Sequence, residues 1–364
     1  MNPLFFSKKS IVFICLLCQL TSKAQVCTGS LGDPVVNVSF GTGTNPGSSL
    51  VAATTSYFFT SSICPPDGGY TVVNSTSGCF SNSWHTLIED HTPGDANGYM
   101  MLVNASFTPS DFYVDTVKNL CANTTYELAA WILNVLIPGA CSPNPILPKL
   151  IFNIETVTGT VLGTYSTGDI PSSSSPTWKQ YGLFFTTPVN TNTVVIRLTN
   201  TAPGGCGNDL ALDDITFRPC GPSVIAVVGN NNKNIFDVCK GSIPNIGIVG
   251  QIGSGYIAPA SQWQQSTDNG VTWSDIAGAT ALSYSFNKTA VGIYQYRLTV
   301  AEANNIGIST CRVASNPVIV TIHDVPVATA ASNSPVCVKQ AINLSASGGA
   351  NYAWSGPASF NSNM

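Results

Sequence analysis

Short runs of alternating apolar and polar residues constrain the fold of this chain most strongly. Apolar side chains occupy every second position in 194–198 and again in 150–154. Such period-2 alternation is typical of β-strands with one buried face. Stretches rich in Gly, Pro or Ser at 41–43, 65–69 and 172–176 separate these runs. The sequence therefore predicts an all-β protein built as a sandwich or jelly roll.

The composition agrees with this fold class and excludes several others. Only 9% of the residues are charged, against about 25% in an ordinary globular domain. Hydrophobic residues still make up 44%, which is enough to form a core and excludes intrinsic disorder. The net charge of −4 argues against a basic nucleic-acid-binding protein, so no nucleic-acid partner is expected.

The first 24 residues have the layout of a secretory signal peptide. Lys8 and Lys9 precede an apolar run at 11–20, and small residues stand at Ser22 and Ala24. The run is too short to span a bilayer, and we expect cleavage after Ala24. No small residue directly precedes a cysteine as a lipid-anchored precursor requires. The sequence predicts a secreted or cell-surface protein without a membrane span.

Export determines how the cysteines are interpreted. Ten of the 12 cysteines lie beyond the signal peptide, and in an oxidising compartment they are expected to form disulfides. No Cys-x-x-Cys pair is present among these ten, so a zinc ribbon is not predicted. Seven of the ten precede residue 221, and the sequence leaves their connectivity open.

The chain is expected to form two complete domains and part of a third. Residues 26–221 form one large jelly-roll domain. Residues 222–324 follow an immunoglobulin-like (Ig-like) order, with a cysteine (Cys239), a core tryptophan (Trp263) and then a tyrosine in a Gly-x-Tyr context. Tyr296 occupies the place of an antibody domain's second cysteine, so Cys311 is the expected disulfide partner of Cys239. Residues 325–364 begin the Cys–Trp pattern again and stop halfway, which predicts a product of a longer gene.

Two segments resemble known repeats. Residues 263–273 and the Tyr-Ala-Trp-Ser-Gly-Pro segment at 352–357 resemble Ig-like or PKD-like repeats of large secreted Bacteroidetes proteins. That resemblance implies a C-terminal sorting signal for type IX secretion further along the gene. Residues 178–187, 194–198 and 210–217 resemble carbohydrate-binding modules with a galactose-binding-like jelly roll. This second resemblance implies the fold and, more weakly, sugar binding.

A calcium site is suggested by one carboxylate on the last strand of the first domain. Strict alternation would place Asp213 on the apolar face with Ala211, Ile215 and Phe217, where a lone carboxylate is costly. The resembling modules hold a structural calcium ion near such an aspartate. Oxygen ligands suit calcium, and the candidates are Asp213, Asp33, Asp90, Asp95 and Asn97. The alternative is a hydrogen-bonded turn with no ion.

Loop aromatic residues are the candidates for sugar binding, because pyranose rings stack on aromatic faces. We expect this role for Trp84, Tyr57, Tyr70 and Tyr99. Trp131 is assigned to the core, and Trp178 to structural packing. The cluster of His85, Glu89, Asp90 and His91 lacks the spacing of a zinc or catalytic motif and is interpreted as a polar loop.

The sequence therefore favours a non-catalytic extracellular binding protein. Its first domain would bind a polysaccharide or cell-surface glycan, and its Ig-like repeats would act as spacers. Two alternatives stay open. One is a structural adhesin that binds other extracellular proteins, and the other is an accessory region of a larger secreted hydrolase.

Overall fold

The computed structural model describes residues 26–363, apart from 93, 230–231 and 243–244. The predicted signal peptide lies outside the described residues. Within them the chain forms strands and loops with two short 3-10 helices, which confirms the all-β prediction. No helix in this described part is long and apolar enough to cross a membrane. The chain divides into two compact units: a first unit of residues 34–218, and a second unit that joins 27–33 to 219–364.

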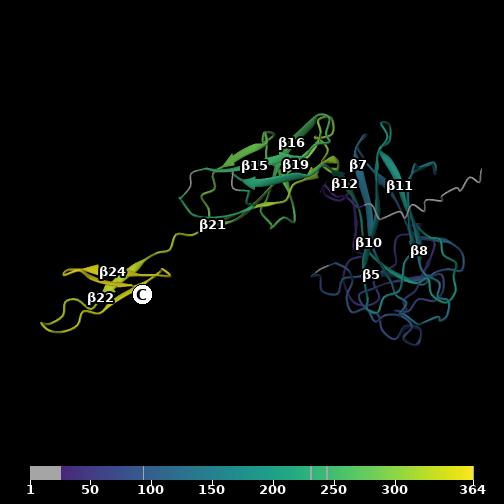
Figure 1. The fold of residues 1–364 in the computed structure, drawn as a ribbon, viewed down its shortest axis with the longest axis horizontal. Helices are drawn as coiled ribbons and strands as arrows, with labels where there is room; N and C mark the ends of the chain where they lie inside the picture. Colours follow the sequence, from purple (N-terminus) through teal and green to yellow (C-terminus); the bar gives the residue numbers. More distant parts are fainter. Residues whose placement is uncertain (1–25, 93, 230–231, 243–244, 364) are drawn as a thin grey trace, which may run out of the picture. The chain divides into compact units, whose positions relative to one another are not determined.

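The first unit contains two sheets whose strands pair mostly antiparallel (Figure 1). The larger sheet has the order β10-β7-β12-β5-β4-β3, and β2 also pairs with β12. Its strands are β2 (Val36–Val38), β3 (Phe58–Phe59), β4 (Gly69–Val73), β5 (Met100–Val103), β7 (Thr125–Asn134), β10 (Lys179–Thr186) and β12 (Leu210–Gly221). The smaller sheet has the order β6-β11-β8-β9, with β6 (Ser110–Lys118), β8 (Lys149–Glu155), β9 (Val161–Asp169) and β11 (Thr193–Asn200).

The main core of the first unit draws alternate residues from both sheets. Val194, Ile196 and Leu198 on β11 are fully buried, as the alternation predicts, and β8 contributes its apolar positions in the same way. On the larger sheet, Leu128 on β7 and Met101 on β5 belong to the same cluster. Burial of these faces stabilises the unit by removing apolar area from water.

A second apolar cluster covers the opposite face of the larger sheet. Met100, Leu102 and Leu133 point away from the main core and pack against loop residues such as Trp84 and Leu87. Strands β4 and β5 are therefore buried on both faces. Two disulfides tie down the covering loops, one between Cys64 and Cys79 and the other between Cys141 and Cys206. We call this side of the larger sheet the covered face.

A left-handed residue within β12 changes the predicted orientation of Asp213. Asp214 has a left-handed backbone with φ 47°, so the alternation shifts by one residue there. Leu212 and Ile215 both belong to the main core, three positions apart. Asp213 shares the covered face with Ala211 and does not share a face with Ile215 and Phe217, so that part of the prediction is wrong.

The second unit contains two further sheets. One has the order β13-β15-β18, with β13 (Val224–Val228), β15 (Ile246–Ile252) and β18 (Ser283–Phe286). The other has the order β14-β21-β19-β16-β17, and β20 also pairs with β19. Its strands are β14 (Ile235–Cys239), β16 (Pro259–Ser266), β17 (Ser274–Asp275), β19 (Gly292–Glu302), β20 (Val313–Ala314) and β21 (Val318–His323).

The core of the second unit forms around Trp263. This side chain is fully buried, and its Nε1 donates to the carbonyl of Ala281 at 2.9 Å. Tyr296 stacks on Phe286 with ring centroids 4.2 Å apart. Tyr296 therefore fills with an aromatic ring the place where an antibody domain has a cysteine.

The predicted Cys239–Cys311 disulfide is wrong. Cys239 is an exposed free thiol, whereas Cys311, in the short helix η2 (Ser309–Cys311), is buried and belongs to another disulfide. The reason is topological: β14 pairs in parallel with β21, so Cys239 lies beside His323. The strand that reaches the core opposite Trp263 is β15, where Ile248 is fully buried.

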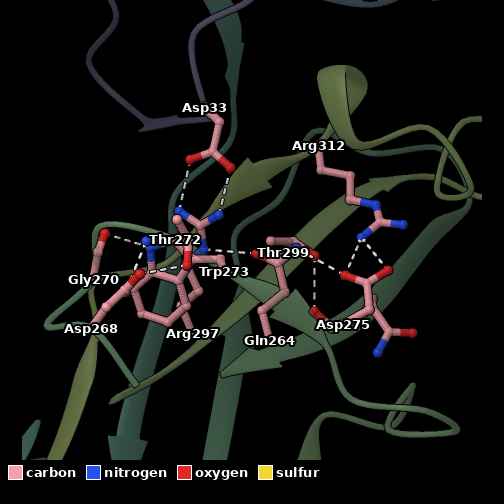
Figure 2. Close-up of polar contacts among 11 residues, drawn as sticks. Asp33, Gln264, Asp268, Gly270, Thr272, Trp273, Asp275, Arg297, Thr299 and Arg312 are labelled. Atoms are coloured by element: carbon pink, nitrogen blue, oxygen red, sulfur yellow. Dashed lines mark hydrogen bonds and ion pairs between the residues drawn. The ribbon is translucent and has the colours of Figure 1, made fainter. Parts of the chain in front are cut away.

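Residues 27–33 are an integral part of the second unit. Cys27 forms a disulfide with Cys220, and β1 (Ser30–Leu31) pairs with the end of β12. Figure 2 shows the carboxylate of Asp33 accepting two hydrogen bonds from Arg297, at 2.8 and 2.5 Å. Gln264 accepts a third hydrogen bond from Arg297, whose guanidinium lies 4.4 Å from the ring of Trp273. The first unit is thus inserted between two segments of the second.

The last residues form two separate antiparallel pairs. One pair joins β22 (Thr329–Ser332) to β23 (Leu344–Ser347), and the other joins β24 (Ala353–Gly356) to β25 (Phe360–Asn363). Leu344 and Phe360 are exposed in these strands.

Candidate functional site: a pocket on the covered face

A small pocket opens on the covered face of the first unit. Its volume is about 160 Å³, and it is lined by Asp67, Phe80, Ser83, Trp84, Asn104, Leu136, Cys141, Gly205, Cys206, Gly207 and Asp209. Cys141 and Cys206, which form one disulfide, line the pocket, and Cys79 of the other disulfide directly precedes Phe80. The pocket is therefore built on loops whose positions are covalently restrained.

The 3-10 helix η1 (Cys79–Asn82) places an aromatic ring at the pocket. Phe80, Ser81 and Asn82 all have left-handed backbones, with φ of 49°, 56° and 64°. Each such conformation is unfavourable for a residue with a Cβ, and strained residues of this kind are concentrated at functional sites. The ring of Phe80 is half exposed and lies 4.7 Å from the ring of Trp84.

Asp209 lies beneath this aromatic pair, directly before β12. Its carboxylate accepts one hydrogen bond from Nε1 of Trp84 and another from the backbone N–H of Ala105, both at 3.2 Å. Burial raises the pKa of Asp209 to about 8, and the nearby charge of Asp67 acts in the same direction. The pocket thus presents aromatic surface beside a carboxyl group that is protonated over most of the neutral range.

A second polar cluster lies elsewhere on the covered face, around Asp213. The backbone N–H of His91 donates to Asp213 at 2.9 Å, and the backbone N–H of Asp214 donates at 2.7 Å. The side chains of His91 and Thr92 contact Asp214 at 2.8 and 2.9 Å. Burial raises the pKa of Asp213 to about 8. Backbone donors therefore satisfy this buried carboxyl group.

Asp90 and Asp95 face each other beside this cluster. A Cβ added to Gly98 would lie 2.3 Å from a carboxylate oxygen of each, so only glycine fits there. One oxygen of Asp90 and one of Asp95 are buried without a hydrogen-bond partner. Burial raises the pKa of Asp90 to about 6, and the charge of Asp95 contributes to this shift.

The structure brings together only part of the predicted calcium shell. Asp90, Asp95 and Asp213 lie in one region, whereas Asp33 belongs to the second unit and pairs there with Arg297. The side chain of Asn97 is exposed. Within the described part of the chain, no group of three or more His, Cys, Asp or Glu residues is arranged to hold a metal ion.

Three of the four predicted sugar-binding rings are in the main core. Tyr57, Tyr70 and Tyr99 are each less than 9% exposed, and Tyr99 donates its hydroxyl to the carbonyl of Thr44 at 2.6 Å. A buried ring cannot offer its face to a sugar, so the structure corrects this assignment. Trp84 does line the pocket, but it is only 4% exposed and supports Phe80 from below.

Phe80 is one of the pocket residues that the sequence analysis missed, together with Asp67 and Asp209. Its signal was local, because an aromatic residue between Gly78 and the polar pair Ser81-Asn82 is unlikely to be core. Trp131 was also assigned to the wrong environment. Its ring is partly exposed and stacks on His91 at 3.8 Å, and Trp178 meets the same histidine edge-on at 5.9 Å.

Comparison with known proteins gives one family match. Residues 228–324 match a family described as a domain of unknown function (DUF8696). This match lies within the second unit and covers less than half of the chain. No curated protein sequence matches the chain significantly.

Several solved structures are similar to part of the chain. A cyclase from Fischerella sp. TAU has 16% identity and a TM-score of 0.31, over 42% of this chain and 75% of that one. A family 16 carbohydrate-binding module has 16% identity and a TM-score of 0.23, over 41% and 84%. The CBM22-1 and GH10 modules of a Clostridium thermocellum xylanase, complexed with xylohexaose, have 14% identity and a TM-score of 0.23, over 41% and 27%.

Proposed function

We propose that this chain is an exported, non-catalytic glycan-binding protein whose pocket on the covered face holds the sugar. The observation that carries the proposal is the Phe80 ring, held half exposed by three consecutive left-handed residues above the carboxyl group of Asp209. Sugar sites combine an aromatic face, which stacks on the ring, with a few polar groups that bind hydroxyls. The disulfides of the first unit are typical of proteins that function outside the cell.

The second unit would serve as a spacer of Ig-like type. Its parallel β14–β21 pair, its buried Trp263 and its two facing sheets support this assignment. In this proposal the spacer carries the binding unit away from its attachment point. Cell-surface location, polysaccharide partners and non-catalytic binding belong to the same proposal.

The test compares two exposed phenylalanines of the first unit. Phe80 lies at the pocket, and Phe184 lies on β10 with a nearly equal exposed fraction, 45% against 44%. We expect the full exported chain to bind a subset of oligosaccharides on a glycan array. Phe80→Ala should weaken that binding at least about tenfold, because it removes the stacking surface, whereas Phe184→Ala should leave it unchanged.

Two results would count against the proposal. Equal binding by the Phe80→Ala and wild-type chains would show that the pocket is not the sugar site. Release of reducing ends from a bound oligosaccharide would show that the protein is a hydrolase and not only a binding protein.

We also propose that a calcium ion binds between Asp90 and Asp95, a smaller shell than the sequence predicts. Their two buried oxygens without partners and the glycine at 98 suit a cation held between the carboxylates. Calcium should then raise the thermal midpoint of the first unit, and chelator should lower it. Asp95→Asn should abolish the difference, while Asp169→Asn, at an exposed position of the same unit, keeps it. An identical midpoint with calcium and with chelator would remove the ion from the proposal.

A further inference from the structure

The lining of the pocket contains acidic side chains and no basic ones. Its lining contains two carboxyl groups, Asp67 and Asp209, and no Lys, Arg or His. Asp67 is exposed, while Asp209 is only 5% exposed. The Asp67 carboxylate repels anions and attracts cations, and the lining holds no basic group to offset it. Uronic acids and sulfated sugars are therefore poor ligands for this site.

The exposed ring of the aromatic pair also favours a cation. The face of an aromatic ring is the negative end of its quadrupole, so a cation above the half-exposed ring of Phe80 is attracted to it. The two rings lie 4.7 Å apart at the same pocket as the carboxyl groups. An ammonium group placed there would lie near the Phe80 ring and the Asp67 carboxylate.

The size of the pocket limits what enters it. A volume of about 160 Å³ is below the roughly 300–1,000 Å³ of pockets that enclose drug-sized molecules. One sugar residue, or one substituent of it, can be accommodated, with the rest of the chain outside. The polar groups of the lining therefore distinguish single sugar residues by the substituents that these sugars carry.

We propose that the pocket selects a sugar bearing a free, protonated amine, such as a deacetylated amino sugar, over its N-acetylated form. This inference rests on the glycan-binding function proposed above. The ammonium group pairs with the Asp67 carboxylate and donates a hydrogen bond to Asp209, which ionises as the cation binds, and the carbon skeleton stacks on Phe80. Nε1 of Trp84 and the backbone N–H of Ala105 hold the Asp209 carboxylate in place from behind. Acetylation removes the charge and adds a bulky group.

The experiment uses titration calorimetry on the full exported chain with three sets of oligomers of equal length. These are glucosamine oligomers, N-acetylglucosamine oligomers and neutral glucose oligomers. We expect the glucosamine oligomers to bind at least about tenfold more tightly than the N-acetylated ones, corresponding to about 1.4 kcal/mol. Asp67→Asn should remove most of that preference without unfolding the protein, because Asp67 is exposed. Asp169→Asn, which changes an exposed carboxylate on β9, is the matched control.

Each outcome decides between the two proposals. Equal binding of acetylated and free-amine oligomers, lost in Phe80→Ala, would overturn the amine selectivity and keep glycan binding. Tight binding of glucosamine oligomers that Asp67→Asn and Phe80→Ala leave unchanged would place the amine elsewhere and overturn the inference. Failure of all three oligomer sets to bind would overturn the inference, and failure on the glycan array as well would overturn the proposed function.

Discussion

Asp209 and Asp213 are buried carboxyl groups of the first unit, and burial raises the pKa of each to about 8. In the unfolded chain both titrate near 3.8. Between these values the folded protein binds more protons than the unfolded one, so the free energy of unfolding falls as the pH rises. The contribution of these two groups to the free energy of unfolding is fully present below about pH 4. It is lost by about pH 8, where both groups ionise in the folded protein as well.

This linkage predicts the behaviour of Asp209→Asn. The amide does not titrate, so the variant should lose part of the decline in unfolding free energy between pH 5 and pH 8. One proton contributes at most about 1.4 kcal/mol per pH unit to that slope. The NH₂ group of the new amide also faces the N–H of Trp84 or of Ala105, so two donors meet. This contact should lower the free energy of unfolding equally at every pH. Urea unfolding at several pH values measures both effects.

The change of slope separates electrostatics from simple loss of packing. Asp169→Asn, at an exposed position, should keep the wild-type slope. If Asp209→Asn also keeps it, Asp209 is ionised in the folded protein and burial does not govern its protonation.

At the scale of elements, helix η1 stores backbone strain at the pocket. Ser81 is exposed and has a left-handed backbone with φ 56° and ψ 39°. Ser81→Val should lower the free energy of unfolding by about 1–3 kcal/mol, because a β-branched residue fits this conformation poorly. Ser81→Gly should not lower it, since glycine adopts this conformation without steric cost. Thermal melts of the two variants give the comparison.

A serine outside η1 supplies the control. Ser61 is also an exposed loop residue and has no left-handed backbone. Ser61→Val should change stability by less than about 0.5 kcal/mol. Equal effects of valine at 61 and 81 would mean that η1 is not strained.

The sequence was sufficient for most strands and insufficient for the orientation of particular side chains. Alternation in 150–154 and 194–198 correctly identified the buried faces of β8 and β11. It failed in β12, because the left-handed backbone of Asp214 interrupts the period. Tyr70 was expected in a loop, but it lies in β4, which is buried on both faces, so its ring has no exposed side. Loop-borne Phe80 has no periodic pattern from which its role could be predicted.

At the scale of the molecule, the sequence could not predict which segments of the chain belong to which unit. Residues 27–33 were assigned to the first domain as part of the continuous range 26–221, yet they belong to the second unit. The contacts responsible join residues far apart in sequence: Cys27 bonds to Cys220, and Asp33 pairs with Arg297. No local pattern encodes a pairing over such separations, since each partner alone resembles an ordinary surface residue.

The Asp33–Arg297 pair should therefore contribute to the stability of the second unit. The guanidinium of Arg297 is largely buried, with 9% of its side chain exposed, and Asp33 is its carboxylate partner (Figure 2). Asp33→Ala leaves that charge without its two charged hydrogen bonds, which should cost about 1–3 kcal/mol. The loss is at the low end if water reaches Arg297 from the side of Asp33, which is more than half exposed.

Hydrogen exchange in the full chain separates the effects on the two units. Asp33→Ala should speed exchange of the β16 and β19 amides, because these strands carry Gln264 and Arg297. Exchange in β8 and β11 should stay as in the wild type, since those strands belong to the first unit. Asp324→Ala, which removes an exposed carboxylate of the second unit, should leave both sets unchanged. Faster exchange in β8 and β11 alone would mean that the N-terminal segment stabilises the inserted unit and not the one that it joins.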